Sequence, residues 1–121
     1  VMAQCTLGKS ICDVENEIFS TSHTVVGNML TRSWMLPAHV CRAILHHHDT
    51  TIFTSTDEHV GTDVCTLIGM VHMAECIADE HLNVRDKEWH IVEHDVLKHF
   101  DMSAQEFSEL KDDLLAFLNG E

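Results

Sequence analysis

Basic side chains are scarce in this sequence of 121 residues, and their scarcity argues against two kinds of partner. Seven lysines and arginines stand against twenty acidic residues, and the formal net charge is −13 when the histidines are neutral. A surface with this charge repels nucleic-acid phosphates and anionic lipids. We therefore expect no nucleic-acid partner and no membrane partner, although protonation of the eleven histidines near pH 6 would reduce the charge.

The sequence also lacks the cysteine spacing of disulfide frameworks and zinc ribbons. The number of cysteines is odd, and no C-x-x-C occurs. The five are Cys5, Cys12, Cys41, Cys65 and Cys76. No basic and apolar leader is present, nor a run of about 18 apolar residues that would span a bilayer. We therefore expect free thiols and a soluble, cytoplasmic protein.

The sequence has only one proline and five glycines. Runs in which β-branched residues alternate with polar ones are short, and apolar residues recur with helical spacing instead. Apolar residues that recur with the helical period predict an all-α fold. At 45% hydrophobic residues the chain can form a core of ordinary size. We expect residues 1–121 to form a single domain, a helical bundle of about five to six helices.

Capping residues and apolar stripes predict where the helices lie. We expect helices over residues 20–34, 37–48, 57–81 and 87–100, and a last helix that begins with the capping box at 103–106. The first stretch, about 2–17, shows no strong N-cap. Gly120 is placed to end the last helix. Trp34 and Leu36 are predicted to be buried anchors that fix the angle between the second and third helices.

Three consecutive histidines, residues 46–48, raise the question of a metal site. Several imidazoles or carboxylates must converge at about 2 Å from one ion. The candidates are His23, His47, His48 and Glu75, each on a predicted helix. On a helix, adjacent His47 and His48 would point about 100° apart, which would hinder binding of both to one ion. Ordinary hydrogen-bonded core histidines are the competing interpretation.

Two His-Asp dipeptides are weak evidence for catalysis. His94–Asp95 lies in an ordinary amphipathic pattern, with Val92, Val96 and Leu97 on its apolar side. His48–Asp49 is also only a dipeptide, and a dipeptide occurs easily by chance in a chain rich in both residues. The sequence contains no G-x-S-x-G and no glycine-rich phosphate loop. We therefore expect no catalytic residue and no residue that binds a cofactor.

The order of several motifs resembles the second half of an HDOD domain, a bacterial relative of the HD phosphohydrolases. The family pattern has an acidic residue, a histidine, V-G, W-x-L-P and A-I-x-x-H-H-D. Here these are Glu15 or Glu17, His23, Val26–Gly27, Trp34–Leu36–Pro37, Ala43–Ile44 and His47–His48–Asp49. Two later stretches, "TLIGMVHMAECIA" and "VLKHFDMSAQEFSELKDDLLAFL", are similar to the rest of the family pattern. The resemblance covers residues 13–119.

The resemblance implies an all-α, HD-type helical bundle. It also implies a regulatory domain of bacterial signal transduction, attached to receiver or other signalling modules as in a response regulator. Active HD and HD-GYP enzymes have an early histidine and an H-D dyad upstream of the position of His23. Residues 1–22 contain no histidine, and the D-G-x-G-Y-P of HD-GYP enzymes is replaced by residues 49–61. The late metal-site aspartate falls at Glu75. We therefore expect the C-terminal part of an HDOD domain from a longer signalling protein, with relic ligands.

The expected function is a non-catalytic regulatory or protein-interaction output domain, not an enzyme. Its partner would be an upstream receiver or other signalling domain, and a homodimer remains an open alternative. We expect no cofactor and no bound metal beyond adventitious divalent ions such as zinc or nickel. The alternative is a metal-dependent phosphohydrolase acting on nucleotides or cyclic dinucleotides. A third hypothesis is a small-molecule sensor with a central pocket at His23 and His47.

Overall fold

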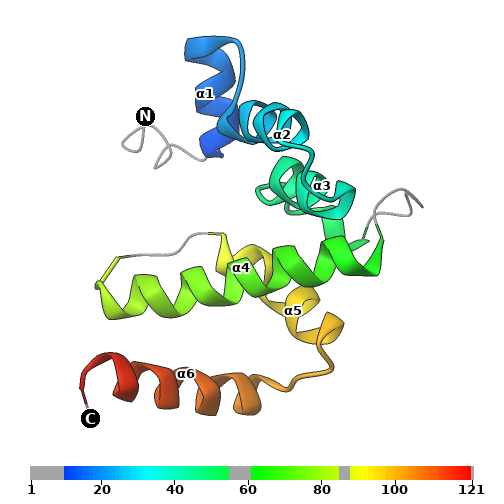
Figure 1. Cartoon of the computed structure of the whole chain (residues 1–121). Coiled ribbons are helices and arrows are strands. Elements are labelled where there is room, and N and C mark those ends of the chain that lie inside the picture. The colour runs from blue at the N-terminus through cyan, green and yellow to red at the C-terminus, as the bar shows by residue number, and fades with distance from the viewer. Residues whose placement is uncertain (1–9, 55–60, 85–87, 121) are drawn as a thin grey trace. The chain divides into compact units, whose positions relative to one another are not determined.

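The structure, a computed structural model, describes residues 10–54, 61–84 and 88–120 (Figure 1). These residues form six α-helices and one short 3-10 helix, and none of them lies in a strand, so the all-α fold class is confirmed. The elements are α1 (Ile11–Phe19), α2 (His23–Ser33), α3 (Ala38–His46), η2 (Ile52–Thr54), α4 (Thr62–His81), α5 (Trp89–His99) and α6 (Ala104–Leu118). Within the described ranges, no helix is both long and apolar enough to cross a bilayer.

Two compact units divide the chain, Val1–Asp49 and Thr50–Glu121. The first unit contains α1, α2 and α3, and the second contains η2, α4, α5 and α6. The single-domain organisation stays a prediction. Residues 2–9 of the predicted first stretch and Asp57, the predicted cap of the long helix, lie outside the described residues.

Helix α1 has the N-cap that the sequence was predicted to lack. The Ser10 hydroxyl accepts a hydrogen bond from the Asp13 backbone N–H at 3.1 Å, so one of the free amides of the first turn is satisfied. The helix ends at Ser20, whose φ of 59° is in the left-handed region. The cap was missed because the apolar pattern was followed upstream of Ser10, although the helix begins at Ile11.

Helices α2 and α3 pack closely because small and polar side chains line their contact. A Cβ added at Gly27 would lie 2.9 Å from the Ile44 Cγ2 atom, so glycine permits this approach. The Asn28 side-chain amide donates to the Cys41 carbonyl oxygen at 2.9 Å. Cys41 is buried, and so is Thr31, whose hydroxyl bonds back to the carbonyl of Gly27. The pair of helices forms the scaffold of the first unit.

The prediction that Trp34 and Leu36 are buried anchors is wrong. Trp34 is 64% exposed and Leu36 is 41% exposed. Helix α2 ends in a Schellman motif, in which Leu36 N–H donates to the Thr31 carbonyl and Met35 N–H to the Arg32 carbonyl. Met35 takes the left-handed position with a φ of 61°. This turn reverses the chain ahead of Pro37 and leaves the indole outside the α2–α3 contact.

Helix α3 begins directly after Pro37, as predicted, but it ends at His46 rather than at residue 48. His47 is the C-cap, and His48 lies in the turn that follows. The 100° rotation between successive helix residues therefore does not fix the directions of the two rings. This early ending decides the geometry of the histidine site.

The second unit has its core between α4, α5 and α6. Helix α4 contacts both other helices, and η2 contacts α5 (Figure 1). Trp89 packs against Phe107 with ring centroids 4.8 Å apart. The buried core cluster consists of Ile77, Trp89, Val92, Val96, Leu97 and Phe107. Four of these lie on α5, and their burial confirms that His94–Asp95 belongs to an ordinary amphipathic helix.

The ends of α6 confirm two predictions from sequence. Ser103 and Glu106 form the predicted capping box, and Gly120 has a left-handed φ of 79° just beyond the helix. The apolar stripe of α6, which the sequence shows at Phe107, Leu110, Leu114 and Phe117, is only partly buried, however. Phe107 is 4% exposed, whereas Phe117 is 77% exposed. The stripe was identified correctly as apolar, but only its first residue packs into the core.

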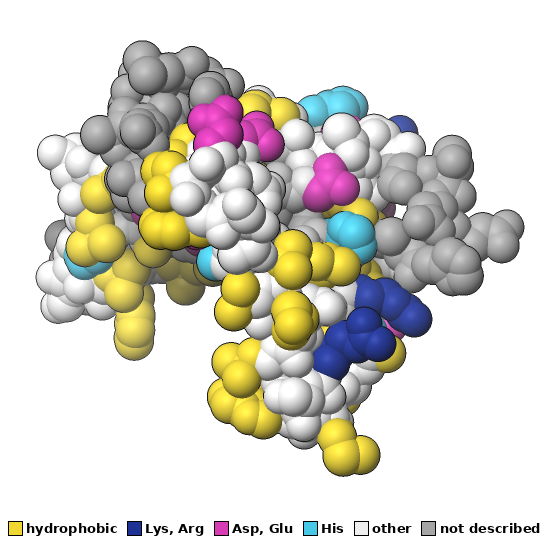
Figure 2. Space-filling view, turned by 90° about the horizontal axis from the view of Figure 1, so that it is seen from above, with side chains coloured by type: hydrophobic (Ala, Val, Ile, Leu, Met, Phe, Trp, Pro, Cys, Tyr) yellow, Lys and Arg dark blue, Asp and Glu magenta, His cyan; other side chains and the backbone are white. Residues whose placement is uncertain are grey.

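Hydrophobic side chains are gathered at the surface, where Figure 2 shows them in yellow. In the first unit most of them come from α2 and the turn that follows it, and Ile18 and Phe19 of α1 are exposed as well. We call the set from α2 and this turn the α2 apolar surface. It consists of Val25, Val26, Met29, Leu30, Trp34, Met35 and Leu36, whose exposed fractions range from 41% to 90%.

Candidate functional site

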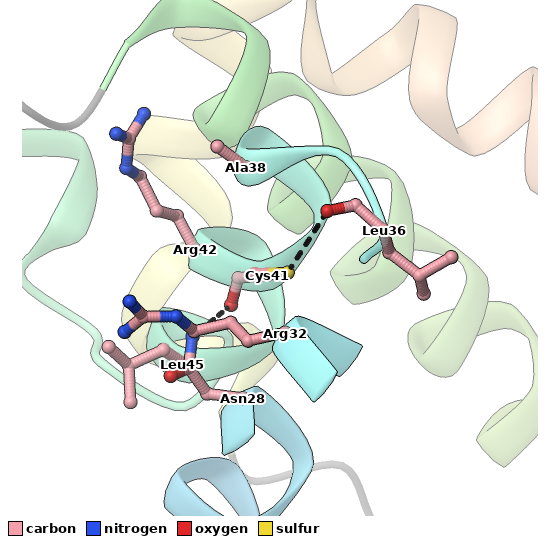
Figure 3. Close-up of a pocket in the computed structure, with 7 residues that line it drawn as sticks. All are labelled: Asn28, Arg32, Leu36, Ala38, Cys41, Arg42 and Leu45. Carbon is pink, nitrogen blue, oxygen red and sulfur yellow. Dashed lines mark hydrogen bonds between the residues drawn. The ribbon is translucent and has the colours of Figure 1, made fainter. Parts of the chain in front are cut away.

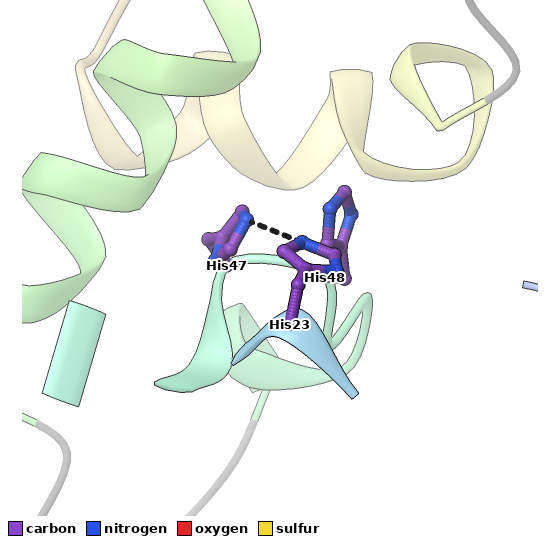
Figure 4. A group of neighbouring side chains, drawn as sticks. All are labelled: His23, His47 and His48. Atoms are coloured by element: carbon purple, nitrogen blue, oxygen red, sulfur yellow. Dashed lines mark hydrogen bonds between the residues drawn. The ribbon is translucent and has the colours of Figure 1, made fainter. Parts of the chain in front are cut away.

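Three histidines of the first unit converge at the ends of two helices (Figure 4). His23 is the first residue of α2, and His47 and His48 directly follow the last residue of α3. Their ligand atoms lie within 4.8 Å of one another. Because α2 and α3 are fixed side by side around Gly27, the start of one helix and the end of the other bring these rings together.

Glu15 of α1 holds His23 at two points. Its Oε1 atom accepts from the His23 Nδ1–H at 2.6 Å and from the His23 backbone N–H at 3.2 Å. The carboxylate therefore caps the N-terminus of α2, where negative charge stabilises the helix. The predicted cap residue Ser22 makes no side-chain cap bond, because its hydroxyl bonds to Thr24 at 2.8 Å. The hydrogen bond from His23 lowers the pKa of Glu15 below its ordinary 4.5.

His47 is fixed from both sides of its ring. Its Nδ1 atom lies 2.6 Å from the Ile44 carbonyl oxygen, and its Nε2 atom lies 3.3 Å from Nε2 of His23. A carbonyl oxygen only accepts, so Nδ1 of His47 carries a hydrogen. The Glu15 carboxylate likewise requires a hydrogen on Nδ1 of His23. With a hydrogen on each Nδ1 atom, the two Nε2 atoms of neutral rings both present lone pairs, so a proton or a metal ion could be held between them.

His48 completes the group. Its ring centroid lies 4.8 Å from that of His23 and 4.2 Å from that of His47. The expectation that His47 and His48 diverge and cannot easily share an ion is therefore wrong. It assumed a helix through residue 48, whereas α3 ends at His46 and the following turn brings the two rings onto the same side.

The arrangement suits a metal ion as well as a proton. Histidine ligands of metals donate their second ring N–H to a carboxylate or a carbonyl oxygen, which is what His23 and His47 do with Glu15 and Ile44. Two nitrogens bound tetrahedrally at about 2.05 Å lie about 3.3 Å apart, and the two Nε2 atoms are 3.3 Å apart. The residues present therefore fit a zinc-like ion held by the three imidazoles.

Glu75, the fourth candidate from the sequence, lies on α4 in the second unit. Its nearest potential ligands there are His72 and Glu88, and the ligand atoms of the three lie within 4.8 Å of one another. Its approach to the histidine group stays a prediction.

Sequence reasoning missed several residues of these groups. It named Glu15 only as one of two choices for the acidic position of a motif, and it omitted His72, Glu88 and Cys12, which lies with Glu15 and His23. The H-x-x-E spacing of His72 and Glu75 was a usable signal, because residues three apart share a helix face. Glu15 and His23 are eight residues apart in different helices, so no periodicity connects them.

A pocket of about 400 Å³ opens elsewhere in the first unit (Figure 3). It is lined by Asn28, Arg32, Leu36, Ala38, Cys41, Arg42 and Leu45. None of its lining residues is a histidine. The idea of a sensor pocket at His23 and His47 stays a prediction, and the basic side chains Arg32 and Arg42 give the observed pocket a different character.

The comparisons with known proteins agree with the motifs of the first unit. Residues 2–50 match the family model of the HDOD domain. The matched segment includes Glu15, His23 and the H-H-D at 47–49. No curated protein and no solved structure matched the chain. Residues 2–50 are therefore similar to the HDOD domain, a family of HD-like domains related to signal transduction, and the predicted resemblance is confirmed over this segment.

Proposed function

We propose that this chain is a non-catalytic regulatory module of bacterial signal transduction that works in the cytoplasm through protein contact. The observation that carries the proposal is the α2 apolar surface. Scattered exposed apolar residues are normal, but a contiguous group usually marks an interaction site. Seven large apolar side chains within twelve consecutive residues, 25–36, form such a group.

The geometry of α2 explains why these side chains act together. Residues 25, 26, 29 and 30 fall within an arc of about 140° on an ideal helix. Trp34 and Met35 continue the apolar surface into the turn, where Met35 is 90% exposed. Trp is among the residues that contribute most to protein interfaces. A partner that covers this side of α2 and the turn after it would bury Trp34.

Charge favours a protein domain as the partner. The net charge of −13 opposes phosphate backbones and anionic lipid. Arg32 and Arg42, two of only seven basic residues, line the pocket beside Leu36 of the α2 apolar surface. A domain with an apolar patch bordered by acidic side chains would complement both features. A receiver or other signalling domain of the parent protein is the partner we propose, and a second copy of this chain is the alternative outcome.

Site-specific photocrosslinking in the native cells tests this contact. A photoreactive residue at position 34 should give an adduct with a signalling domain. The matched control is position 117 in the second unit, where Phe117 is a similarly exposed aromatic. An adduct with another copy of the chain would replace the heterologous contact with a homodimer. Equal, nonspecific crosslinking from both positions would reject the proposal.

A second candidate function rests on the histidine group. The 3.3 Å separation of the two Nε2 atoms and the tethered Nδ1 atoms suit a metal ion, which could activate water in a phosphohydrolase. The upstream H-D dyad of active relatives does not occur in residues 1–22. We predict no turnover of nucleotides or cyclic dinucleotides by this chain with added manganese or iron. Turnover that His47→Ala abolishes would establish the alternative.

A further inference from the structure

A second group of potential ligands lies in the second unit, and of its members only Glu75 falls at a position that the HDOD resemblance links to a metal site. His72 and Glu75 are three residues apart on α4 and therefore share a face of that helix. Glu88 stands at the N-cap of α5. His72 Nδ1 lies 3.9 Å from Glu88 Oε2, and one ligand atom from each residue lies within 4.8 Å of the others. The group thus joins two helices that also pack through the core cluster.

We propose that His72, Glu75 and Glu88 bind one divalent transition-metal ion of the zinc type. One imidazole and two carboxylates are ligands that zinc accepts, with bonds of about 2.0–2.2 Å. Magnesium and calcium prefer all-oxygen sites, so the histidine selects against them. A fourth position would remain for water or for a ligand from outside the group.

The balance of charge supports an ion rather than a simple ion pair. His72 is 2% exposed, and both glutamates are partly buried. With a neutral imidazole the group carries two negative charges, and with a protonated imidazole it still carries one. A divalent ion cancels both charges. A divalent ion therefore matches the charge of these three side chains, taken together, better than a proton does.

The distances allow this with small movements. Atoms bound to one tetrahedral zinc ion lie about 3.3–3.6 Å apart, whereas the His72–Glu88 pair is at 3.9 Å. His72 is held by its burial, but the two glutamates have several rotatable bonds and can close the remaining gap. Because Glu75 and Glu88 come from different helices, the bound ion would tie the face of α4 to the start of α5. It would bind the folded unit only, and so stabilise it.

Zinc titration of the whole chain, purified without an affinity tag and stripped with chelator, tests the proposal. The titration is done in the His23→Ala/His47→Ala background, so that the first histidine group does not contribute. We expect one zinc ion per chain by calorimetry and a rise in melting temperature. Substituting cobalt should give the visible absorption of a four-coordinate site. A tenfold excess of magnesium should not displace either ion.

Isosteric variants locate the ion without disturbing the packing. Glu75→Gln and Glu88→Gln should each weaken zinc binding at least tenfold. The matched control Glu109→Gln changes an exposed glutamate of α6 and should leave the affinity unchanged. Circular dichroism verifies that each variant is folded. Absence of stoichiometric zinc in the background variant would overturn the proposal, as would binding that survives both glutamine variants or that magnesium abolishes.

Discussion

At the scale of the residue, Glu15 is the side chain on which the histidine group depends most. Its carboxylate accepts hydrogen bonds from both the ring and the backbone N–H of His23. It therefore orients the imidazole and caps the N-terminus of α2 at the same time. With Nδ1 of His23 tied to Glu15, Nε2 must point to His47. One carboxylate therefore fixes which nitrogen of His23 is offered to a proton or to a metal ion.

The substitution His23→Ala should raise the pKa of Glu15 toward its ordinary 4.5, because the hydrogen bond from His23 is the largest cause of its lowering. Carbon-13 NMR of the carboxyl group measures this. A folded-state pKa below the unfolded value means that the pair's contribution to stability is present above pH 4.5. It is lost as the pH falls through the lowered pKa. His39→Ala, on α3, is the control, and an equal shift there would contradict the assignment.

At the scale of the element, helix ends determine the site more than helix faces do. Three helices end in the same way, with Met35, Asn83 and Asp101 in the left-handed region. Each is followed by a backbone bond from the next residue to a carbonyl of the last turn, such as Val84 N–H to Asp79 O at 2.7 Å. Stripes and caps located α2, α3, α5 and α6 within a few residues, whereas α1 begins at Ile11, well after the start of the predicted first stretch. They could not locate the end of α3, because histidines at 46–48 continue a helical pattern equally well.

The contact between α2 and α3 should be sensitive to a single methyl group at Gly27. The added Cβ would lie 2.9 Å from Cγ2 of Ile44, a β-branched side chain with little freedom in a helix. Overpacking costs about 1–3 kcal/mol, and the better helix propensity of alanine returns about 1 kcal/mol. We expect Gly27→Ala to lower the free energy of unfolding by about 1 kcal/mol, measured in urea.

A double-mutant cycle isolates the cause of that loss. In an Ile44→Ala background the obstructing methyl group is gone, so Gly27→Ala should become neutral or stabilising. If Gly27→Ala costs the same with and without Ile44, the close approach of the helices is not the reason for the glycine.

At the scale of the whole molecule, composition and periodicity predicted the all-α class because they depend on local preferences along the chain. They could not predict which apolar residues are buried. Phe117 belongs to an apolar pattern as regular as that of Val96, yet Val96 is fully buried and Phe117 is 77% exposed. A stripe shows that a surface is apolar, but it carries no information on what covers it. The HDOD motifs identified the histidines for a different reason, since they depend on a resemblance and not on periodicity.

The two tryptophans provide a comparison between the units. Trp89 is 6% exposed and belongs to the core cluster of the second unit, where it packs on Phe107, whereas Trp34 in the first unit is 64% exposed. Removing a buried Trp costs about 3–5 kcal/mol. Exposed substitutions usually change stability by less than about 0.5 kcal/mol. Trp89→Ala should therefore lower the melting temperature strongly or prevent folding, while Trp34→Ala should melt close to the unchanged chain. Loss of stability in Trp34→Ala as large as in Trp89→Ala would mean that Trp34 is covered within the folded protein, and the α2 apolar surface would then not be available to a partner.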